Sequence, residues 1–273
     1  MEEVKLDKQS VQWTMLLPLW GRATASYSDP EILNDPEAER IVRECGYDFK
    51  DVERSFGEYA GVCYVVRARK TDDAIKDFIK KHPKASIVNI GSGLDTMFSR
   101  VDNGQIKWYN LDLPDAIAFR ESLITEKERS KNIPISMLDT EWFERVDFNK
   151  EDGAFFFAAG VFHYFKEEEL KVMVSAMAEH FPKGELFFDA ETAAAIKKSN
   201  KMVRKTGNTN AVMYFSVNKA KKLNDWSPKV RLISEEPYFK GIKRNKKWKL
   251  STRIIISMSD AANMVKFIHL RFE

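Results

Sequence analysis

The sequence predicts an α/β fold with a doubly wound, mostly parallel sheet of seven strands and an antiparallel hairpin at one edge. Residues 84–191 alternate short apolar segments with helical or loop segments, which is typical of a parallel sheet. Ala154–Ala159 is apolar throughout, as expected of a central strand that is buried on both faces. Two later apolar segments, Val230–Phe239 and Met264–Phe272, predict the antiparallel hairpin.

The first 83 residues are predicted to be helical. Residues 12–20 are rich in large apolar side chains, and we expect either a lid over the site or a helix packed on the core. Asp35 followed by Pro36 predicts the start of a second helix, with aspartate as its cap. Thr71-Asp72-Asp73 predicts the start of another, which His82-Pro83 would end.

The parallel strands follow in chain order, each ending near a polar residue or glycine. They are predicted at Ser86–Ile90, Ile106–Leu111, Ile133–Leu138, Ala154–Ala159 and Glu185–Asp189. Helices are expected at 116–129 and 167–180, between the strands. The segment 193–223 is predicted to be helical and basic.

Composition excludes several classes of protein. The 273 residues include 44 basic and 41 acidic side chains, so the formal net charge of +3 gives no general argument for nucleic-acid binding. Cys45 and Cys63 are the only cysteines and four histidines are scattered, so we expect no disulfide framework and no metal site. No apolar run approaches the roughly 20 residues of a membrane span, and the polar start is unlike a secretory signal. We therefore expect a cytoplasmic protein.

A glycine-rich loop and an acidic residue carry the main functional signal. Gly91 and Gly93 follow the first strand directly, where glycine allows a sharp turn and close approach to a ligand. Asp112 ends the second strand, and an acid at this position can accept hydrogen bonds from the hydroxyls of a ribose. The pair predicts a nucleoside-containing cofactor at the carboxyl ends of the strands.

The loop favours S-adenosylmethionine over a dinucleotide. Thr96 stands where a dinucleotide fingerprint has its third glycine or an alanine, and the loop contains no lysine or arginine for a phosphate. S-adenosylmethionine has a ribose but no phosphate, and its charged amino-acid end suits a loop that carries Asp95. From these residues alone, a nicotinamide dehydrogenase and a glycine turn without a ligand remain alternatives.

Residues 87–120 contain a G-S-G-L-D-T loop, a V-D-N-G turn and a W-Y-x-L-D-L-P motif followed by an arginine. In these motifs the chain resembles the Rossmann-like leucine carboxyl methyltransferase family, which includes the tetracenomycin-type O-methyltransferases of polyketide biosynthesis. Further matching segments extend the resemblance over nearly the whole chain: residues 17–23, 47–49, 66–73, 136–142 and 159–165.

The resemblance implies a class I methyltransferase fold in one domain, residues 1–273. Residues 1–83 would form a helical lid, 84–191 the cofactor-binding core, and 192–273 the substrate-side helices and edge strands. Arg67 would bind the methionine carboxylate, Asp112 the ribose and Leu113 the adenine. The expected cofactor-binding residues are Arg67, Gly91, Ser92, Gly93, Asp95, Asp112, Leu113, Ser136, Met137, Asp139 and Ala159.

Several of these residues have alternative interpretations. Many relatives carry an acid where this chain has Ser136, so we expect the contact to the adenine amino group either to be weaker or to shift to Asp139. Relatives also often carry a glutamate at the position of Ala159, which leaves open whether this chain holds the amino-acid end of the cofactor in the usual way. Asp139 could instead cap the following turn, and Arg67 could form a surface salt bridge with Asp72 or Asp73. His163 is the only candidate for a catalytic base, and a packed, hydrogen-bonded histidine is the alternative.

The resulting hypothesis is an S-adenosylmethionine-dependent O-methyltransferase that acts on a carboxyl or hydroxyl oxygen of a small, polyketide-like acceptor. One alternative is methylation of the carboxyl group of a protein's C-terminal leucine. Another is a cofactor-binding module without turnover, motivated by Ser136 and Ala159. The basic runs at 197–205 and 240–253 favour a solvated face, or attraction of an acidic small molecule, over RNA binding.

Overall fold

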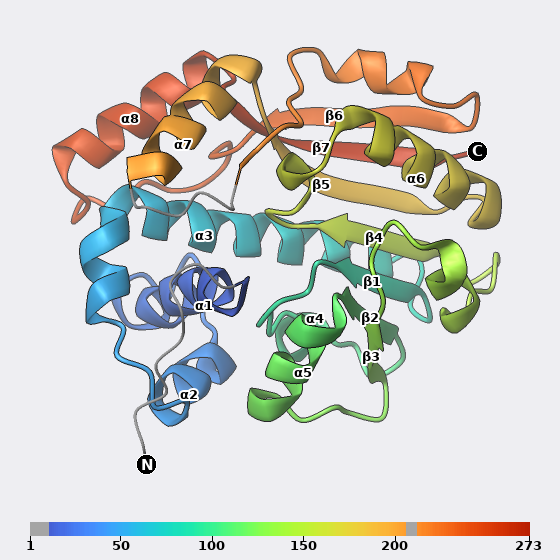
Figure 1. The fold of residues 1–273 in the computed structure, drawn as a ribbon, viewed down its shortest axis with the longest axis horizontal. Coiled ribbons are helices and arrows are strands. Elements are labelled where there is room, and N and C mark those ends of the chain that lie inside the picture. Colours follow the sequence, from blue (N-terminus) through green and yellow to red (C-terminus); the bar gives the residue numbers. More distant parts are fainter. Residues whose placement is uncertain (1–10, 206–211) are drawn as a thin grey trace.

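The computed structural model describes residues 11–205 and 212–273. A sheet of seven strands with the order β3-β2-β1-β4-β5-β7-β6 divides the helices into layers (Figure 1). The strands are β1 Ser86–Ile90, β2 Lys107–Asp112, β3 Ser130–Pro134, β4 Ala154–Ala158, β5 Glu185–Glu191, β6 Val230–Pro237 and β7 Val265–Phe272. The first five strands pair in parallel, and β7 runs antiparallel to both β5 and β6. The predicted fold class is therefore confirmed.

The helices lie before, between and after these strands. They are α1 Val11–Ser28, α2 Pro36–Glu44, α3 Lys50–Ile79, α4 Phe98–Val101, α5 Pro114–Leu123, α6 Glu167–His180, α7 Ala193–Lys205 and α8 Leu250–Ala261. Short 3₁₀ turns occur at η1 Thr140–Arg145, η2 Phe162–Tyr164 and η3 Ala220–Asp225. None of the helices in the described part of the chain is long and apolar enough to cross a membrane.

The central strands are buried on both faces because each face packs on its own helices. In β4, Phe156 joins the core cluster beneath α6, whereas Phe155 and Phe157 join the cluster beneath α3. β1 lies between β2 and β4, so the chain turns in opposite directions on its two sides. Such a switch point opens a crevice at the carboxyl ends of the strands, where ligands bind in doubly wound sheets.

The N-terminal helices pack on this frame. The long helix α3 contains a kink at Gly57, whose φ is +58°, and its later part covers the sheet. Helix α1 packs on α2 and α3, and its buried Leu16 and Leu19 share a core cluster with Leu94. Residues 14–20 therefore pack against the protein near the end of β1, and whether they also open as a lid stays a prediction.

A buried ion network joins four of the helical segments. The Asp35 carboxylate, fully buried at the start of α2, accepts hydrogen bonds from Arg22 of α1 at 3.0 Å and Arg100 of α4 at 2.5 Å. Arg100 also donates to both oxygens of Asp72 in α3, at 2.8 and 2.9 Å. Burial alone would raise the pKa of Asp35, but Arg100 and Arg22 outweigh it and hold the pKa below its ordinary value.

Several predicted elements differ from the structure. The strand expected at 133–138 is β3, which starts and ends earlier, because Met137 is buried in a turn and not in a strand. Thr71-Asp72-Asp73 does not start a helix but lies inside α3, since Arg100 and Arg69 bind the two aspartates. The predicted helix 116–129 ends at Leu123.

The C-terminal segment also differs from the prediction. Instead of one helix over 193–223, α7 ends at Lys205, and η3 forms from Ala220, with 206–211 outside the described residues. Helix α8 was not predicted and separates the two strands of the expected hairpin. Its buried face contains the polar Thr252 and Ser259 beside Ile256, whereas Leu250 and Met258 are exposed, so apolar side chains do not mark a single buried face.

Asp35→Ala should lower the free energy of unfolding by about 3–5 kcal/mol, because Arg22 and Arg100 would remain buried without their carboxylate. Urea unfolding measures this. Asp77→Ala is the control, since it removes an exposed i,i+3 pair with Lys80 and should change stability by less than about 1 kcal/mol. Equal losses of unfolding free energy in the two variants would contradict the stabilising role of the buried ion network.

Candidate functional site

The glycine loop and Asp112 meet at the carboxyl edge of β1 and β2. The Gly93 N–H donates to Asp112 Oδ2 at 2.8 Å, and the Leu113 N–H donates to Oδ1 at 2.8 Å. Gly91 and Ser92 donate to the Leu111 carbonyl, at 2.8 and 3.2 Å. A carboxylate has about four acceptor positions, so Asp112 can still accept hydrogen bonds from two ribose hydroxyls. Its pKa is raised by burial, which the two backbone N–H groups only partly offset.

Two buried arginines hold the carbonyl groups of this loop. Arg120 of α5 donates to the Gly93 carbonyl at 2.9 Å and to the Asp95 carbonyl at 2.7 Å. Arg22 of α1 donates to the Leu94 carbonyl between them at 2.7 Å. Burial lowers the pKa of Arg120 to about 10, so the side chain remains a cation at neutral pH. The loop is thereby fixed before any ligand binds.

The loop glycines have conformational reasons to be glycine. Gly91 has φ +66° and Gly93 has φ +45°, a region that favours glycine. A Cβ on Gly91 would lie 2.5 Å from the side chain of Val161, and one on Gly93 would lie 3.5 Å from that of Met15. The lack of a side chain at Gly91 and Gly93 thus leaves room for the side chains of Val161 and Met15. That it also allows close approach of a ligand stays a prediction.

Arg67 lies at the carboxyl edge of β4 and β5, where it binds Asp189. Its Nε and Nη2 donate to Asp189 Oδ2 at 3.1 and 2.9 Å. The other oxygen, Oδ1, accepts from the Gly160 N–H at 2.6 Å, directly after Ala159. The alternative that Arg67 pairs with Asp72 or Asp73 is therefore wrong.

The predicted adenine-side residues follow β2 and β3. Leu113 and Leu138 have side chains 43% and 37% exposed, so both present apolar surface beside Asp112 and after β3. The Ser136 Oγ accepts from the Leu138 N–H at 3.3 Å. The Met137 side chain is buried in the core, which leaves only its backbone for a cofactor contact.

Two predicted polar residues also have local structural roles. Asp139 accepts from the Glu141 N–H at 2.9 Å and caps η1, as the alternative interpretation expected. Asp95 accepts from the Met97 N–H at 2.5 Å at the entry to α4. Neither role excludes a cofactor contact, which stays a prediction for both.

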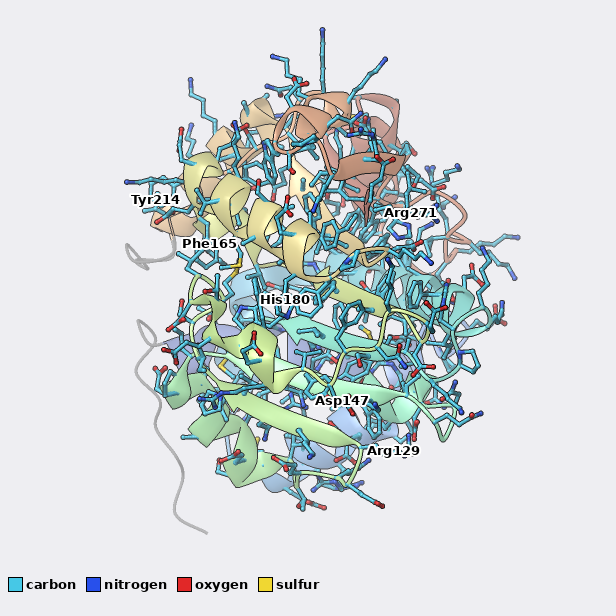
Figure 2. All side chains as sticks on the ribbon, turned by 90° about the vertical axis from the view of Figure 1, so that its right-hand side faces the viewer. Arg129, Asp147, Phe165, His180, Tyr214 and Arg271 are labelled. Atoms are coloured by element: carbon cyan, nitrogen blue, oxygen red, sulfur yellow. The ribbon has the colours of Figure 1, made fainter. Side chains whose placement is uncertain are left out.

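His163 lies just after β4, as expected, but it is packed inside the protein. Its side chain is buried, and burial lowers the pKa of the imidazole to about 4. Its carbonyl accepts from the Tyr214 N–H at 2.6 Å, which ties a distant segment to this edge. Figure 2 shows Tyr214 and Phe165 on one side of the molecule, opposite Arg129, Asp147 and Arg271. The imidazole is neutral at pH 7 and is a weak base.

Sequence reasoning missed several residues of this site. Asp189 and Glu191 lie at the end of β5. Asp189 binds Arg67 of α3, and Glu191 accepts a hydrogen bond from Ser199 of α7. Their position at the carboxyl end of a parallel strand was a usable signal. Arg22 and Arg120 left no such signal, because their partners are backbone carbonyls of another segment.

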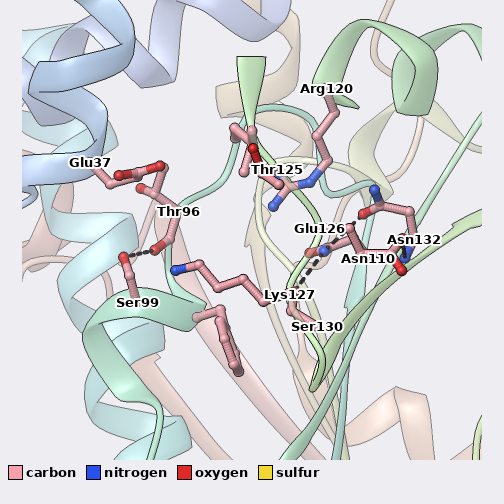
Figure 3. Close-up of a pocket in the computed structure, with 12 residues that line it drawn as sticks. Glu37, Thr96, Ser99, Asn110, Arg120, Thr125, Glu126, Lys127, Ser130 and Asn132 are labelled. Atoms are coloured by element: carbon pink, nitrogen blue, oxygen red, sulfur yellow. Dashed lines mark hydrogen bonds between the residues drawn. The ribbon is translucent and has the colours of Figure 1, made fainter. Parts of the chain in front are cut away.

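A small cavity lies between the start of α4, helix α5 and strands β2 and β3 (Figure 3). Its volume of about 20 Å³ suits a single water molecule, and Thr96, Asn110, Arg120 and Asn132 are among the residues that line it. It is too small for a cofactor. In the described part of the chain, no group of three or more His, Cys, Asp or Glu side chains is placed to hold a metal ion.

The residues at the carboxyl edge fit S-adenosylmethionine. Asp112 offers free acceptor positions to the ribose, and the exposed leucines offer apolar surface to the adenine. The buried Ser92 Oγ in the loop has no hydrogen-bond partner among the described residues, which suits a polar ligand. Arg67 provides a cation for the methionine carboxylate.

Comparisons with known proteins show the family of the chain. The family model described as leucine carboxyl methyltransferase matches residues 16–178, more than half of the chain. The chain belongs to the leucine carboxyl methyltransferase family. It is an S-adenosylmethionine-dependent methyltransferase, as predicted, and the nicotinamide dehydrogenase alternative is not supported.

Two relatives align over most of this methyltransferase. It is 26% identical to the tetracenomycin polyketide synthesis O-methyltransferase TcmP of Streptomyces glaucescens, over 87% of this chain and 88% of TcmP. It is 23% identical to the S-adenosyl-L-methionine-dependent methyltransferase dpfgK of Gibberella zeae, over 70% of this chain and 69% of that protein.

Solved structures share the fold of this methyltransferase. A DUF574 family protein from Streptomyces avermitilis superposes with a TM-score of 0.60 at 14% identity, over 85% of this chain and 90% of that chain. A SAM-dependent methyltransferase from Anabaena variabilis superposes with a TM-score of 0.51 at 11% identity, over 76% and 85% of the two chains.

Asp112→Ala should weaken S-adenosylmethionine binding by roughly 10- to 100-fold, because hydrogen bonds to a charged group contribute about 1.5–3 kcal/mol. Isothermal titration calorimetry measures the dissociation constant. Asp147→Ala, which removes an exposed aspartate at the opposite edge of the sheet, is the control and should leave it unchanged. Unchanged affinity in the folded Asp112 variant would refute the proposed ribose contact.

The stability of the protein should fall as the pH drops from 6.5 toward 4. His163 stays neutral in the folded state, whereas the unfolded histidine takes up a proton below its ordinary pKa of 6.5. This difference is worth roughly 3 kcal/mol at the acid end. His163→Gln should lose that part of the pH dependence in urea unfolding curves. A wild-type slope in the variant would mean that other groups cause it.

Proposed function

We propose that this methyltransferase transfers a methyl group from S-adenosylmethionine to an oxygen of a small, polyketide-like acceptor. The observation that carries the proposal is the direct hydrogen bond between the glycine loop and Asp112 at the switch point of the sheet. The similarity to TcmP over 87% of the chain supports oxygen as the methyl acceptor and a polyketide as its class.

The cofactor would lie along the carboxyl edge of the sheet. Asp112 would bind the ribose, Leu113 and Leu138 would flank the adenine, and Arg67 would bind the methionine carboxylate. When bound, the cofactor supplies a methyl group already activated by its sulfonium. The chain's own residues then have to align the acceptor oxygen with that methyl group and exclude water, and such positioning can lower a barrier by roughly 7–11 kcal/mol.

A carboxylate acceptor needs no base, whereas a hydroxyl acceptor does. His163 is neutral and can take a proton, but its pKa of about 4 makes it a weak base for a phenol. Glu191 is a second candidate at this edge, because its pKa is raised by burial and, among the described residues, only the Ser199 hydroxyl binds its side chain. Carboxyl and hydroxyl acceptors therefore both remain within the proposal.

The other parts of the prediction fit this scheme. We propose one domain in which residues 1–83 cover the cofactor, since Met15 of α1 lies beside Gly93. The two cysteines are free thiols, which supports the cytoplasm as the location. A cofactor-binding module without turnover is the weaker alternative. It was motivated by the lack of an acid at Ala159, but Asp189 places a carboxylate beside Gly160, the next residue.

Calorimetry with S-adenosylmethionine, followed by methyl-transfer assays, tests the proposal. We expect cofactor binding and transfer to at least one polycyclic polyketide acid or phenol, detected as a methylated product by mass spectrometry. A peptide that ends in leucine should not be methylated, and its methylation would instead favour the protein-directed alternative. A folded protein that does not bind the cofactor at millimolar concentration would contradict the proposed function.

A further inference from the structure

The pair formed by Arg67 and Asp189 places opposite charges next to each other at the carboxyl edge of β4 and β5. The Asp189 side chain is 4% exposed and that of Arg67 is 19% exposed, so the pair is largely shielded from water but Arg67 remains accessible. A cation and an anion this close match a ligand that itself carries both charges.

Within the part of the chain that the structure describes, Arg67 keeps unused donors beside the loop that follows β4. Only two of the five N–H groups of its guanidinium, on Nε and Nη2, bind Asp189. Its Nη1 lies at Gly160, where a Cβ would come within 2.6 Å of it and where φ is +79°. A glycine at this position therefore keeps Nη1 uncovered, and Nη1 can donate to a carboxylate.

Asp189 keeps an unused acceptor position in the same place. Both hydrogen bonds from Arg67 end on Oδ2, whereas Oδ1 accepts only the Gly160 N–H among the described residues. An oxygen of an ionised carboxylate has two acceptor positions, so one remains on Oδ1. An ammonium group is the complementary donor for a buried carboxylate oxygen.

The position of the pair relative to Asp112 also fits one extended ligand. Gly160 follows β4 and Asp112 ends β2, and these two strands lie on either side of β1 in the sheet. The Val161 side chain, next to Gly160, lies against Gly91 of the loop whose Gly93 binds Asp112. The nucleoside position and the charged pair are therefore connected along a single edge.

We propose that Asp189 binds the ammonium group of the methionine moiety, while it also holds Arg67 in position for the carboxylate of the same zwitterion. This assignment rests on the proposed function and adds a ligand contact that the sequence did not reveal. It also explains how the chain manages with Ala159, because the acid comes from the end of β5 and not from the end of β4.

Calorimetry with three adenosyl compounds tests the assignment. S-adenosylhomocysteine carries both charged groups, decarboxylated S-adenosylmethionine lacks the carboxylate, and methylthioadenosine lacks the entire amino-acid end. The wild-type protein should bind S-adenosylhomocysteine at least tenfold more tightly than methylthioadenosine. Equal affinities would overturn the assignment but leave Asp112 and the proposed function intact, whereas binding of none of the three would refute the proposed function as well.

Asp189→Asn should weaken binding of S-adenosylhomocysteine and of the decarboxylated compound by roughly tenfold or more. It should leave methylthioadenosine binding within about twofold, which also proves that the variant is folded. Asp102→Asn is the matched control, because it breaks another aspartate–arginine pair, with Arg129, at the opposite edge of the sheet. This control should bind all three compounds like the wild type.

Gly160→Ala gives an independent result if the buried Asp189 variant does not fold. Its Cβ would displace Nη1 of Arg67, so S-adenosylhomocysteine binding should weaken more than binding of the decarboxylated compound. Loss of all three affinities in parallel, in either folded variant, would show that the pair has a purely structural role and would overturn the proposal.

Discussion

The peptide that joins β1 to α4 is held in place by charged hydrogen bonds, and the rest of the site depends on it. Arg120 and Arg22 bind three successive carbonyl groups of the loop, and Asp112 binds the Gly93 N–H. Charge-assisted bonds are stronger than neutral ones, and these are shielded from water. The loop therefore does not need to be ordered by the cofactor, which removes an entropic cost from binding.

The helices that precede the sheet take part in this arrangement. Arg22 donates both to the Leu94 carbonyl and to Asp35, whose carboxylate also binds Arg100 and the Thr96 hydroxyl. The loop is thus anchored to α1, α2 and α4 through one buried carboxylate. This explains why a protein with a common sheet devotes so many residues to helices before its first strand. They support the glycine loop as well as covering it.

The two parts of the carboxyl edge, at Asp112 and at Arg67, are electrostatically different. Around Asp112, a single carboxylate faces backbone N–H groups, as a neutral sugar requires. Around Arg67 and Asp189, charges of both signs lie together, as the amino-acid end of the cofactor requires. Beyond them, the buried His163 and the partly buried Glu191 have no ion pair among the described residues, and burial lowers the pKa of His163 to about 4 and raises the pKa of Glu191. The polarity of the edge therefore changes along the direction in which the cofactor would lie.

The sequence by itself determined the fold class, the glycine loop, Asp112 and the family, because these depend on local patterns such as apolar runs and a fixed spacing between glycine and acid. It did not determine the bounds of β3, which is a polar edge strand, or the existence of α8, whose buried face is partly polar. Nor did it reveal that Asp189 partners Arg67 across 122 positions of the chain, or that Arg22 reaches the loop across 72. Only the tertiary structure decided these pairings, because the partner of a buried charge is set by which segments pack together in space.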